Sequence, residues 1–213
     1  MGTRSGSPLG DMSGKIGTIV LSKWKGISVV KGLPDKTKKV SLKQQSQRTL
    51  FTTVMNFLSG ANEVIKLGYQ LPNKSKVSEM NMATTYHILN AVRGEYPDYS
   101  FDLSKLKFSS PIRSTENGWN AEFTGSKDFP VSVSWEMNPF PKKVTRWDDQ
   151  AVIVLYDTRK FVVFKNAERR ELNFLIPNSD HFYGRDLFCW LFFISADGKF
   201  VSETEYLGMI TMV

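Results

Sequence analysis

Near the N-terminus, short apolar runs alternate with glycines. Residues 15–24 and 27–31 are rich in Ile, Val and Trp and flank the pair Lys25-Gly26. Two such runs around a glycine-containing turn predict a β-hairpin. Because an isolated hairpin is only marginally stable in water, we expect residues 1–40 to form an arm that docks on another surface. This surface is either the protein's own body or a neighbouring copy.

Between residues 41 and 96, apolar residues recur at helical spacing. Ser41 and Gln44 form a capping-box pattern that opens a helix. Gly60 is expected to weaken this helix midway, and Gly68 is a plausible stop signal at its end. The apolar face of the helix is predicted to contain Leu50, Phe51, Val54, Phe57, Leu58, Ala61, Val64 and Ile65.

A second helix is predicted to start after Ser78 and to end at Gly94. Met82, Tyr86 and Leu89 are its large apolar residues, and we expect it to bury them. Residues 41–96 are therefore interpreted as a helical segment.

From Pro97 onward the period changes to two. Val131, Val133 and Trp135 face one way and the intervening serines face the other, which is typical of a half-buried strand. Further strands are predicted at 101–108, 119–124, 151–157, 160–165, 171–176, 187–195 and 200–211. Short strands without helices between them favour an antiparallel sandwich over residues 97–213. The predicted fold class is α+β: an N-terminal β-hairpin arm and two helices, followed by an antiparallel immunoglobulin-like β-sandwich.

The net charge of +7 is concentrated at the N-terminus. Residues 1–48 carry ten Lys or Arg against two Asp, which is +8. The remaining 165 residues carry 18 basic and 19 acidic side chains, which is −1. The basicity therefore belongs to the N-terminal segment, and the body is close to neutral.

This basic segment contains the candidate binding residues, which serve either assembly or nucleic-acid binding: Lys15, Lys23, Trp24, Lys25, Lys31, Lys36, Lys38, Lys39 and Arg48. Cations mixed with an aromatic ring are typical of nucleic-acid binders. A second interpretation is that the lysines blunt the exposed edges of a hairpin and solvate a linker. A third is that the segment is an assembly arm that adds strands to a neighbouring subunit.

The sequence contains no recognisable catalytic apparatus, so no catalytic residue, metal site or cofactor is predicted. Its two histidines, His87 and His181, and its one cysteine, Cys189, give no zinc-ligand spacing and no intramolecular disulfide. The acidic pair Asp148-Asp149 is interpreted either as a cation or acid–base site or as a solvated strand entry. No nucleotide-binding or hydrolase motif is present.

No apolar run has the length of a membrane span, and the N-terminus lacks the apolar stretch of a signal peptide. We therefore expect a cytoplasmic or particle-associated protein without a cleaved signal peptide and without membrane insertion.

Several stretches resemble an uncharacterised family of Bacteroidota proteins. They begin with Gly14-Lys15-Ile16-Gly17, Trp24-Lys25-Gly26, Val30-Lys31 and Gln45 to Arg48, and they continue through Gly94-Glu95-Tyr96-Pro97, Leu175-Ile176-Pro177 and Tyr206-Leu207-Gly208. Lys31 stands where the family usually has an arginine, which keeps the charge but loses the planar fork. Similar patterns occur in short bacteriophage proteins. The resemblance supports the architecture and transfers no catalytic residue.

Together these observations favour a non-enzymatic structural or interaction protein. We expect it to form a homo-oligomer, or to join a larger phage-like particle, through the basic N-terminal arm. The alternative is a nucleic-acid-binding protein that uses the same Lys and Arg cluster, and an enzyme is the least favoured class.

Overall fold

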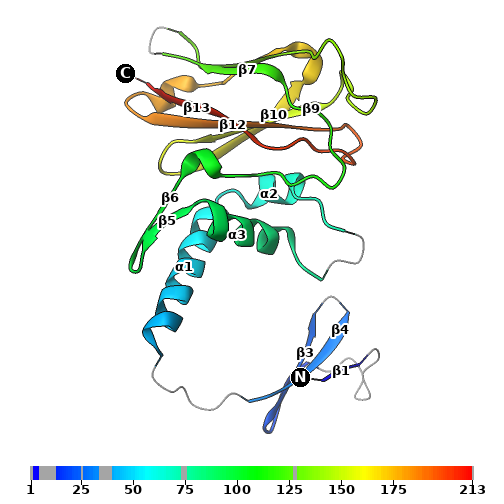
Figure 1. Ribbon diagram of the computed structural model, residues 1–213, viewed down its shortest axis with the longest axis vertical. Coiled ribbons are helices and arrows are strands. Elements are labelled where there is room, and N and C mark those ends of the chain that lie inside the picture. The colour runs from blue at the N-terminus through cyan, green and yellow to red at the C-terminus, as the bar shows by residue number, and fades with distance from the viewer. Residues whose placement is uncertain are drawn as a thin grey trace. The chain divides into compact units, whose positions relative to one another are not determined.

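The computed structural model describes residues 2–4, 13–24, 26–33, 40–72, 76–126 and 129–212, with only the backbone of residues 2–4. The chain divides into two compact units between Gln45 and Ser46. The described residues form a mixed α+β structure with three helices and antiparallel sheets (Figure 1). The predicted α+β class is thereby confirmed.

The first unit contains a four-stranded antiparallel sheet in the order β1-β4-β3-β2. Its strands are β1 (Gly2–Arg4), β2 (Gly14–Ile16), β3 (Ile19–Trp24) and β4 (Ile27–Gly32). Strands β3 and β4 are the predicted hairpin, and Gly26 in their turn has a φ of 78°, which glycine adopts without steric cost. The predicted run 15–24 is interrupted at Gly17, which has a φ of 58° and separates β2 from β3, and strand β1 was not predicted.

Three helices occupy the segment where two were predicted. They are α1 (Leu42–Ser59), α2 (Asn62–Gly68) and α3 (Glu79–Asn90). The capping box is present, since the Gln44 N–H donates to Ser41 Oγ and the Ser41 N–H donates to Gln44 Oε1. The predicted first helix is interrupted at Gly60, which separates α1 from α2.

Gly68 ends α2, as predicted, but its role is close packing. A Cβ atom at this position would lie 2.1 Å from the carbonyl oxygen of Phe108. The chain after Gly68 pairs with a distant segment through the Tyr69–Ser110 bridge. A side chain at position 68 would therefore push these two backbone segments apart.

The strands of the second unit form three further antiparallel sheets. The largest has the order β10-β9-β12-β13, from β9 (Gln150–Tyr156), β10 (Phe161–Glu168), β12 (Asp186–Ile194) and β13 (Glu205–Thr211). A second has the order β11-β8-β7, from β7 (Trp119–Thr124), β8 (Ser132–Glu136) and β11 (Asn173–Leu175). A hairpin pairs β5 (Val92–Glu95) with β6 (Asp98–Phe101). Short 3-10 turns occupy Leu103–Lys105, Arg169–Glu171 and Ser179–Phe182.

Strands β9 and β12 are buried on both faces. Val152 and Val154 of β9 join the core formed with the helices, whereas Ile153 and Leu155 join the core shared with β7 and β8. Figure 1 shows the helices on one side of this sheet and β7 on the other. Two-sided burial explains why these strands read as continuous apolar runs rather than alternating ones.

The strand predicted at residues 101–108 is wrong over most of its length. Strand β6 ends at Phe101, and the chain then makes a 3-10 turn. The Asp102 carboxylate accepts a hydrogen bond from Ser104 Oγ at 2.6 Å, and its carbonyl accepts one from the Lys105 N–H. Such local bonds compete with strand pairing.

The predicted buried face of α3 is correct only in part, because Met82 and Tyr86 are half-buried and the fully buried positions are others. Its buried residues are Ala83, Thr84 and His87, whereas Leu89 is 76% exposed. The polar side chains are tolerated because both are hydrogen-bonded. Thr84 Oγ1 donates to the Met80 carbonyl, and the His87 ring lies between the Ala83 carbonyl at 2.7 Å and the Lys107 N–H at 3.2 Å. The Lys107 N–H requires an acceptor at Nε2, so Nδ1 of His87 carries the proton and the ring is neutral.

Acid is predicted to destabilise the second unit through His87. Burial lowers the pKa of His87 below its ordinary value of 6.5, and the backbone hydrogen bond to Ala83 acts in the opposite direction. Below pH 6.5 the imidazole of His87 therefore binds a proton more readily in the unfolded chain than in the folded chain. The free energy of unfolding falls as the pH drops below 6.5 for this reason. In His87→Gln, which retains both hydrogen-bonding roles without titrating, the fall is expected to be shallower. Urea denaturation above and below pH 6.5 measures the free energy of unfolding of both proteins. If this free energy falls equally with pH in the natural chain and in the variant, the role of His87 is contradicted.

Candidate functional site

The alternation of side chains in the first unit divides its residues between two faces. Directly paired residues of antiparallel strands share a face. Lys15 pairs with Val20, and Val20 pairs with Lys31, so these three lie together. Trp24 lies on the same face because it is an even number of residues from Val20. We call this the lysine face, defined by Lys15, Val20, Trp24, Ile27, Val29 and Lys31.

The opposite side of the sheet carries Lys23 and a group of four apolar residues. Ile16 pairs with Ile19 and Leu21 pairs with Val30, and we call these four residues the apolar face. Leu21 is 8% exposed, whereas Ile16, Ile19 and Val30 are 57%, 44% and 45% exposed. Among the described residues before the division between the units, Leu21 is the only buried hydrophobic side chain.

The structure brings together part of the predicted binding cluster. Lys15, Trp24 and Lys31 share the lysine face, whereas Lys23 lies on the opposite side because it is adjacent to Trp24 in β3. Arg48 lies on α1 within the second unit, so it is not part of the sheet. Four predicted residues lie outside the described part of the chain, namely Lys25, Lys36, Lys38 and Lys39.

The acidic pair is neither a solvated strand entry nor a carboxylate cluster. Asp149 is fully buried, and its Oδ2 accepts hydrogen bonds from Thr115 Oγ1 at 3.0 Å and from the Arg146 N–H at 3.2 Å. The same oxygen lies 3.5 Å from Nε of Arg169, whose side chain is 2% exposed. Asp149 is therefore half of a buried ion pair, and the interpretation as a solvated residue is wrong.

Arg169 uses its remaining donors to hold a loop. Its Nη1 donates to the carbonyl of Asn117 at 2.9 Å and its Nη2 to the carbonyl of Glu116 at 2.5 Å. The guanidinium carbon lies 3.8 Å from the ring centroid of Phe193. Burial lowers the pKa of the Arg169 guanidinium, while the carboxylates of Asp149 and Glu116 act in the opposite direction. One buried cation thus fixes the backbone of two consecutive loop residues.

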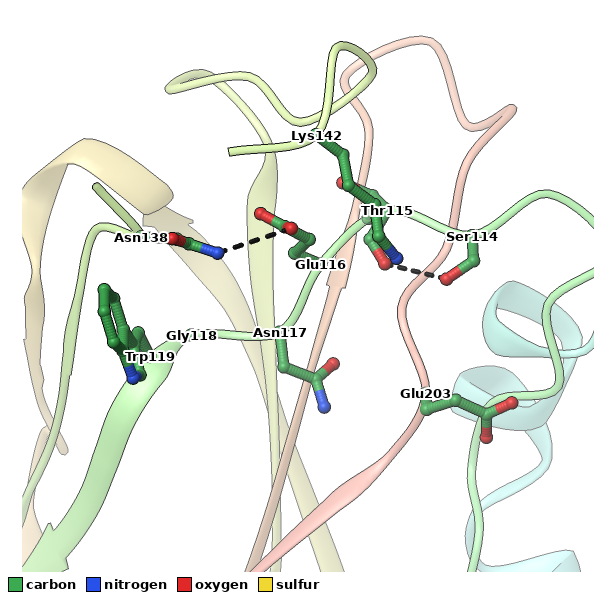
Figure 2. Close-up of a pocket in the computed structure, with 9 residues that line it drawn as sticks. All are labelled: Ser114, Thr115, Glu116, Asn117, Gly118, Trp119, Asn138, Lys142 and Glu203. Atoms are coloured by element: carbon green, nitrogen blue, oxygen red, sulfur yellow. Dashed lines mark hydrogen bonds between the residues drawn. The ribbon is translucent and has the colours of Figure 1, made fainter. Parts of the chain in front are cut away.

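A pocket of about 340 Å³ lies beside this loop (Figure 2). Residues 114–119 form one wall, and Asn138, Lys142 and Glu203 complete the lining. The Asn138 amide is held in place, since its Oδ1 accepts from the Phe140 N–H at 2.8 Å and its Nδ2 donates to Glu116 Oε1 at 3.4 Å. Sequence reasoning missed this pocket because its residues come from separate loops and carry no spacing motif.

Two negative findings concern the described part of the chain. No group of three or more His, Cys, Asp or Glu side chains is arranged to hold a metal ion. None of the helices has the length and apolar character needed to cross a membrane. Cys189 is buried, and burial raises the pKa of its thiol well above the ordinary value.

The fold and these surfaces define a two-unit α+β protein with a sheet-forming N-terminal unit. The chain belongs to the family of unknown function DUF6266, which it matches over residues 11–208. The predicted membership of an uncharacterised family is confirmed, and its Bacteroidota origin stays a prediction. No curated protein and no solved structure matches the chain.

Arg169 is predicted to be a major source of stability. The variant Arg169→Met leaves the Asp149 carboxylate buried without its cation and two carbonyls without their donor. We expect the free energy of unfolding to fall by about 3–5 kcal/mol, measured by urea denaturation. The matched control is Arg170→Met, because Arg170 is 54% exposed and its ion pair with Glu168 is superficial. The control is expected to cost about 0–1 kcal/mol, and equal losses in the two variants would refute a special role for Arg169.

Proposed function

We propose that the protein is a non-enzymatic interaction protein that assembles with further copies of itself through its N-terminal sheet. The observation that carries this proposal is the exposed apolar face of that sheet. Three of its four side chains, Ile16, Ile19 and Val30, are between 44% and 57% exposed.

A sheet of this kind gains little stability by itself. Hydrophobic burial is the dominant favourable contribution to folding, and each large aliphatic side chain contributes about 1.5–3 kcal/mol when it is fully buried. Leu21 is the only buried hydrophobic residue among the described residues of the first unit. A surface that covers Ile16, Ile19 and Val30 would supply the missing burial.

The distribution of charge favours a second copy as this surface, and favours one side of the sheet over the other. The side that holds the apolar face carries one lysine among the described side chains, Lys23, which pairs with Ser28 at the end of β3 away from Ile16 and Ile19. The lysine face carries Lys15 and Lys31 on either side of Val20, so two such faces would repel each other. Identical apolar faces related by a two-fold axis are self-complementary.

The test is the mass of the full chain by size-exclusion chromatography with light scattering. The natural sequence is expected to give an oligomer. Replacing Ile16 and Ile19 together by Ser removes apolar area from the contact, so the dissociation constant should rise by about tenfold or more. The matched control replaces Lys15 and Lys31 by Gln on the other face, and its mass should be unchanged.

Several outcomes would contradict assembly. One is a natural chain that is monomeric, and another is an Ile16 and Ile19 variant with unaltered mass. A third is an insoluble product when residues 1–40 are deleted. Assembly predicts that the shortened chain is a folded monomer, whereas insolubility would mean that the N-terminal segment belongs to the protein's own core.

Nucleic-acid binding is the second candidate, and the composition of the lysine face supports it. Lys15 and Lys31 flank Val20 of β3, and the same strand carries Trp24, which is 48% exposed. Cations offer contacts to phosphates, and an aromatic ring offers a stacking surface for a base.

Nucleic-acid binding is tested with the variant that removes the two lysines of the lysine face. Replacing Lys15 and Lys31 by Gln should weaken binding to single-stranded oligonucleotides. It should also reduce the slope of log affinity against log salt by about 0.7 for each lost phosphate contact. Fluorescence anisotropy at several salt concentrations measures both quantities, and the Ile16 and Ile19 variant is the control. An unchanged salt slope would exclude this face as the binding surface.

The remaining predictions about architecture and location belong with this proposal. The immunoglobulin-like sandwich predicted for residues 97–213 is supported by the single core that β7 and β8 share with β9 and β12. A cytoplasmic or particle-associated location is consistent with an assembling protein, and particle association would make the N-terminal sheet the contact element.

A further inference from the structure

A second pocket of the second unit has two cations and no carboxylate among the described residues that line it. Its volume of about 400 Å³ is within the range of small-ligand pockets. It lies where three segments meet that are distant in the sequence: the chain after α2, the chain before β7 and the turn between β12 and β13. We call it the Gln70 pocket, and its lining residues are Gln70, Leu71, Pro72, Ile112, Arg113 and Lys199.

The Gln70 side chain fixes the three segments relative to one another. Its Oε1 accepts hydrogen bonds from the N–H groups of Ile112 and Arg113, both at 2.8 Å. Its Nε2 donates to the carbonyl of Lys199 at 2.8 Å. The Arg113 carbonyl in turn accepts from the Val201 N–H at 3.0 Å. The backbone segments that carry the two cations are therefore held together, and a ligand would meet a preformed surface, which reduces the entropic cost of binding.

The positive charge of the Gln70 pocket is only partly compensated. Arg113 is exposed and takes part in no ion pair among the described residues. Lys199 is paired with Asp197 at 2.8 Å, but both side chains are at least half exposed, and a pair that is this open to water is weak. Asp197 itself lines a different pocket. The Gln70 pocket therefore presents the charge of Arg113, and the Lys199 ammonium is a further donor in the same lining.

The rest of the lining offers an aliphatic surface. Ile112 is 56% exposed, although it is adjacent in sequence to Arg113 and its backbone is held by Gln70. Leu71 is half-buried and Pro72 is exposed. A ligand that covers Ile112 would remove apolar area from water, which is favourable. The pocket thus combines one uncompensated cation with apolar side chains.

We propose that the Gln70 pocket binds a small aliphatic carboxylate. The Arg113 guanidinium would pair with the carboxylate, to which its planar fork of donors is suited, and the Lys199 ammonium would donate a further hydrogen bond. The aliphatic part would pack on Ile112. A carboxylate brings a single negative charge, which matches the charge of Arg113, whereas a phosphate monoester brings about −1.5 to −2. This site belongs to the second unit, so the proposal does not depend on assembly through the N-terminal sheet.

The test follows the Cδ1 methyl resonances of the isoleucines in the full chain by nuclear magnetic resonance during titration with hexanoate. Ile112→Val removes one resonance and thereby assigns it. We expect the Ile112 resonance to move with hexanoate, whereas those of the buried residues Ile153 and Ile176 stay. Four further probes vary one property each: acetate lacks the aliphatic chain, hexan-1-ol is neutral, hexylamine is cationic and hexyl phosphate carries the larger negative charge.

The chain provides a matched pair of arginines. Arg113→Gln should weaken hexanoate binding by about tenfold or more, as expected for the loss of a hydrogen bond to a charged group. The control is Arg146→Gln, because Arg146 is also exposed but lines a different pocket. It should leave hexanoate binding unchanged.

Gln70→Glu is an independent test of the same pocket. Its carboxylate can still accept from the N–H groups of Ile112 and Arg113. Its negative charge opposes an anion, however, so hexanoate binding should weaken although no cation has been removed.

Four outcomes would overturn the proposal. The first is an Ile112 resonance that hexanoate does not move. The second is equal weakening by Arg113→Gln and Arg146→Gln, which would mean general electrostatic attraction rather than a pocket. The third is binding of acetate or hexan-1-ol as tight as that of hexanoate, because either the chain or the charge would then contribute nothing. The fourth is tighter binding of hexylamine or hexyl phosphate. The resonances of Ile153 and Ile176 report in each variant that the fold is intact.

Discussion

The second unit depends on one buried cation. Arg169 connects three distant parts of the chain: the Asp149 carboxylate, the ring of Phe193 and the carbonyls of Glu116 and Asn117. Its own carbonyl accepts a hydrogen bond from Nε1 of Trp135 at 2.8 Å. A buried charge is tolerated only where such partners are supplied. Because strands from both sheets meet at this residue, its position sets the shape of the loop that forms the pocket wall.

The pocket wall and the N-terminal sheet are held by different interactions. The pocket wall is held by hydrogen bonds and close packing within the second unit, so it is shaped before any ligand arrives. The N-terminal sheet is held by strand pairing, with Leu21 its only described buried hydrophobic side chain. Its apolar face would therefore gain stability from a second surface that covers it. This is why we propose assembly for the sheet.

Local patterns predicted the elements that depend on local physics. The β3–β4 hairpin, the Ser41 capping box and most strands after residue 119 follow from turn glycines, side-chain caps and apolar runs. The failures required information from distant residues. His87 is buried in α3 because Lys107, far along the chain, supplies a hydrogen bond. Arg169 likewise gave no signal, because its partners are separated from it in sequence. Of the predicted binding cluster, the hairpin register placed Lys15, Trp24 and Lys31 together, which spacing alone did not establish.

The two-sided burial of β9 and β12 has a consequence for how the second unit opens. The helices and the β7–β8 layer rest on opposite faces of the same two strands. Detaching either layer exposes residues adjacent in sequence to those that anchor the other. The second unit should therefore behave as a single cooperative block in hydrogen exchange, with its slowest amides in these two strands. A mutation that loosens the packing of one layer would also destabilise the other layer, because both pack on the same backbone.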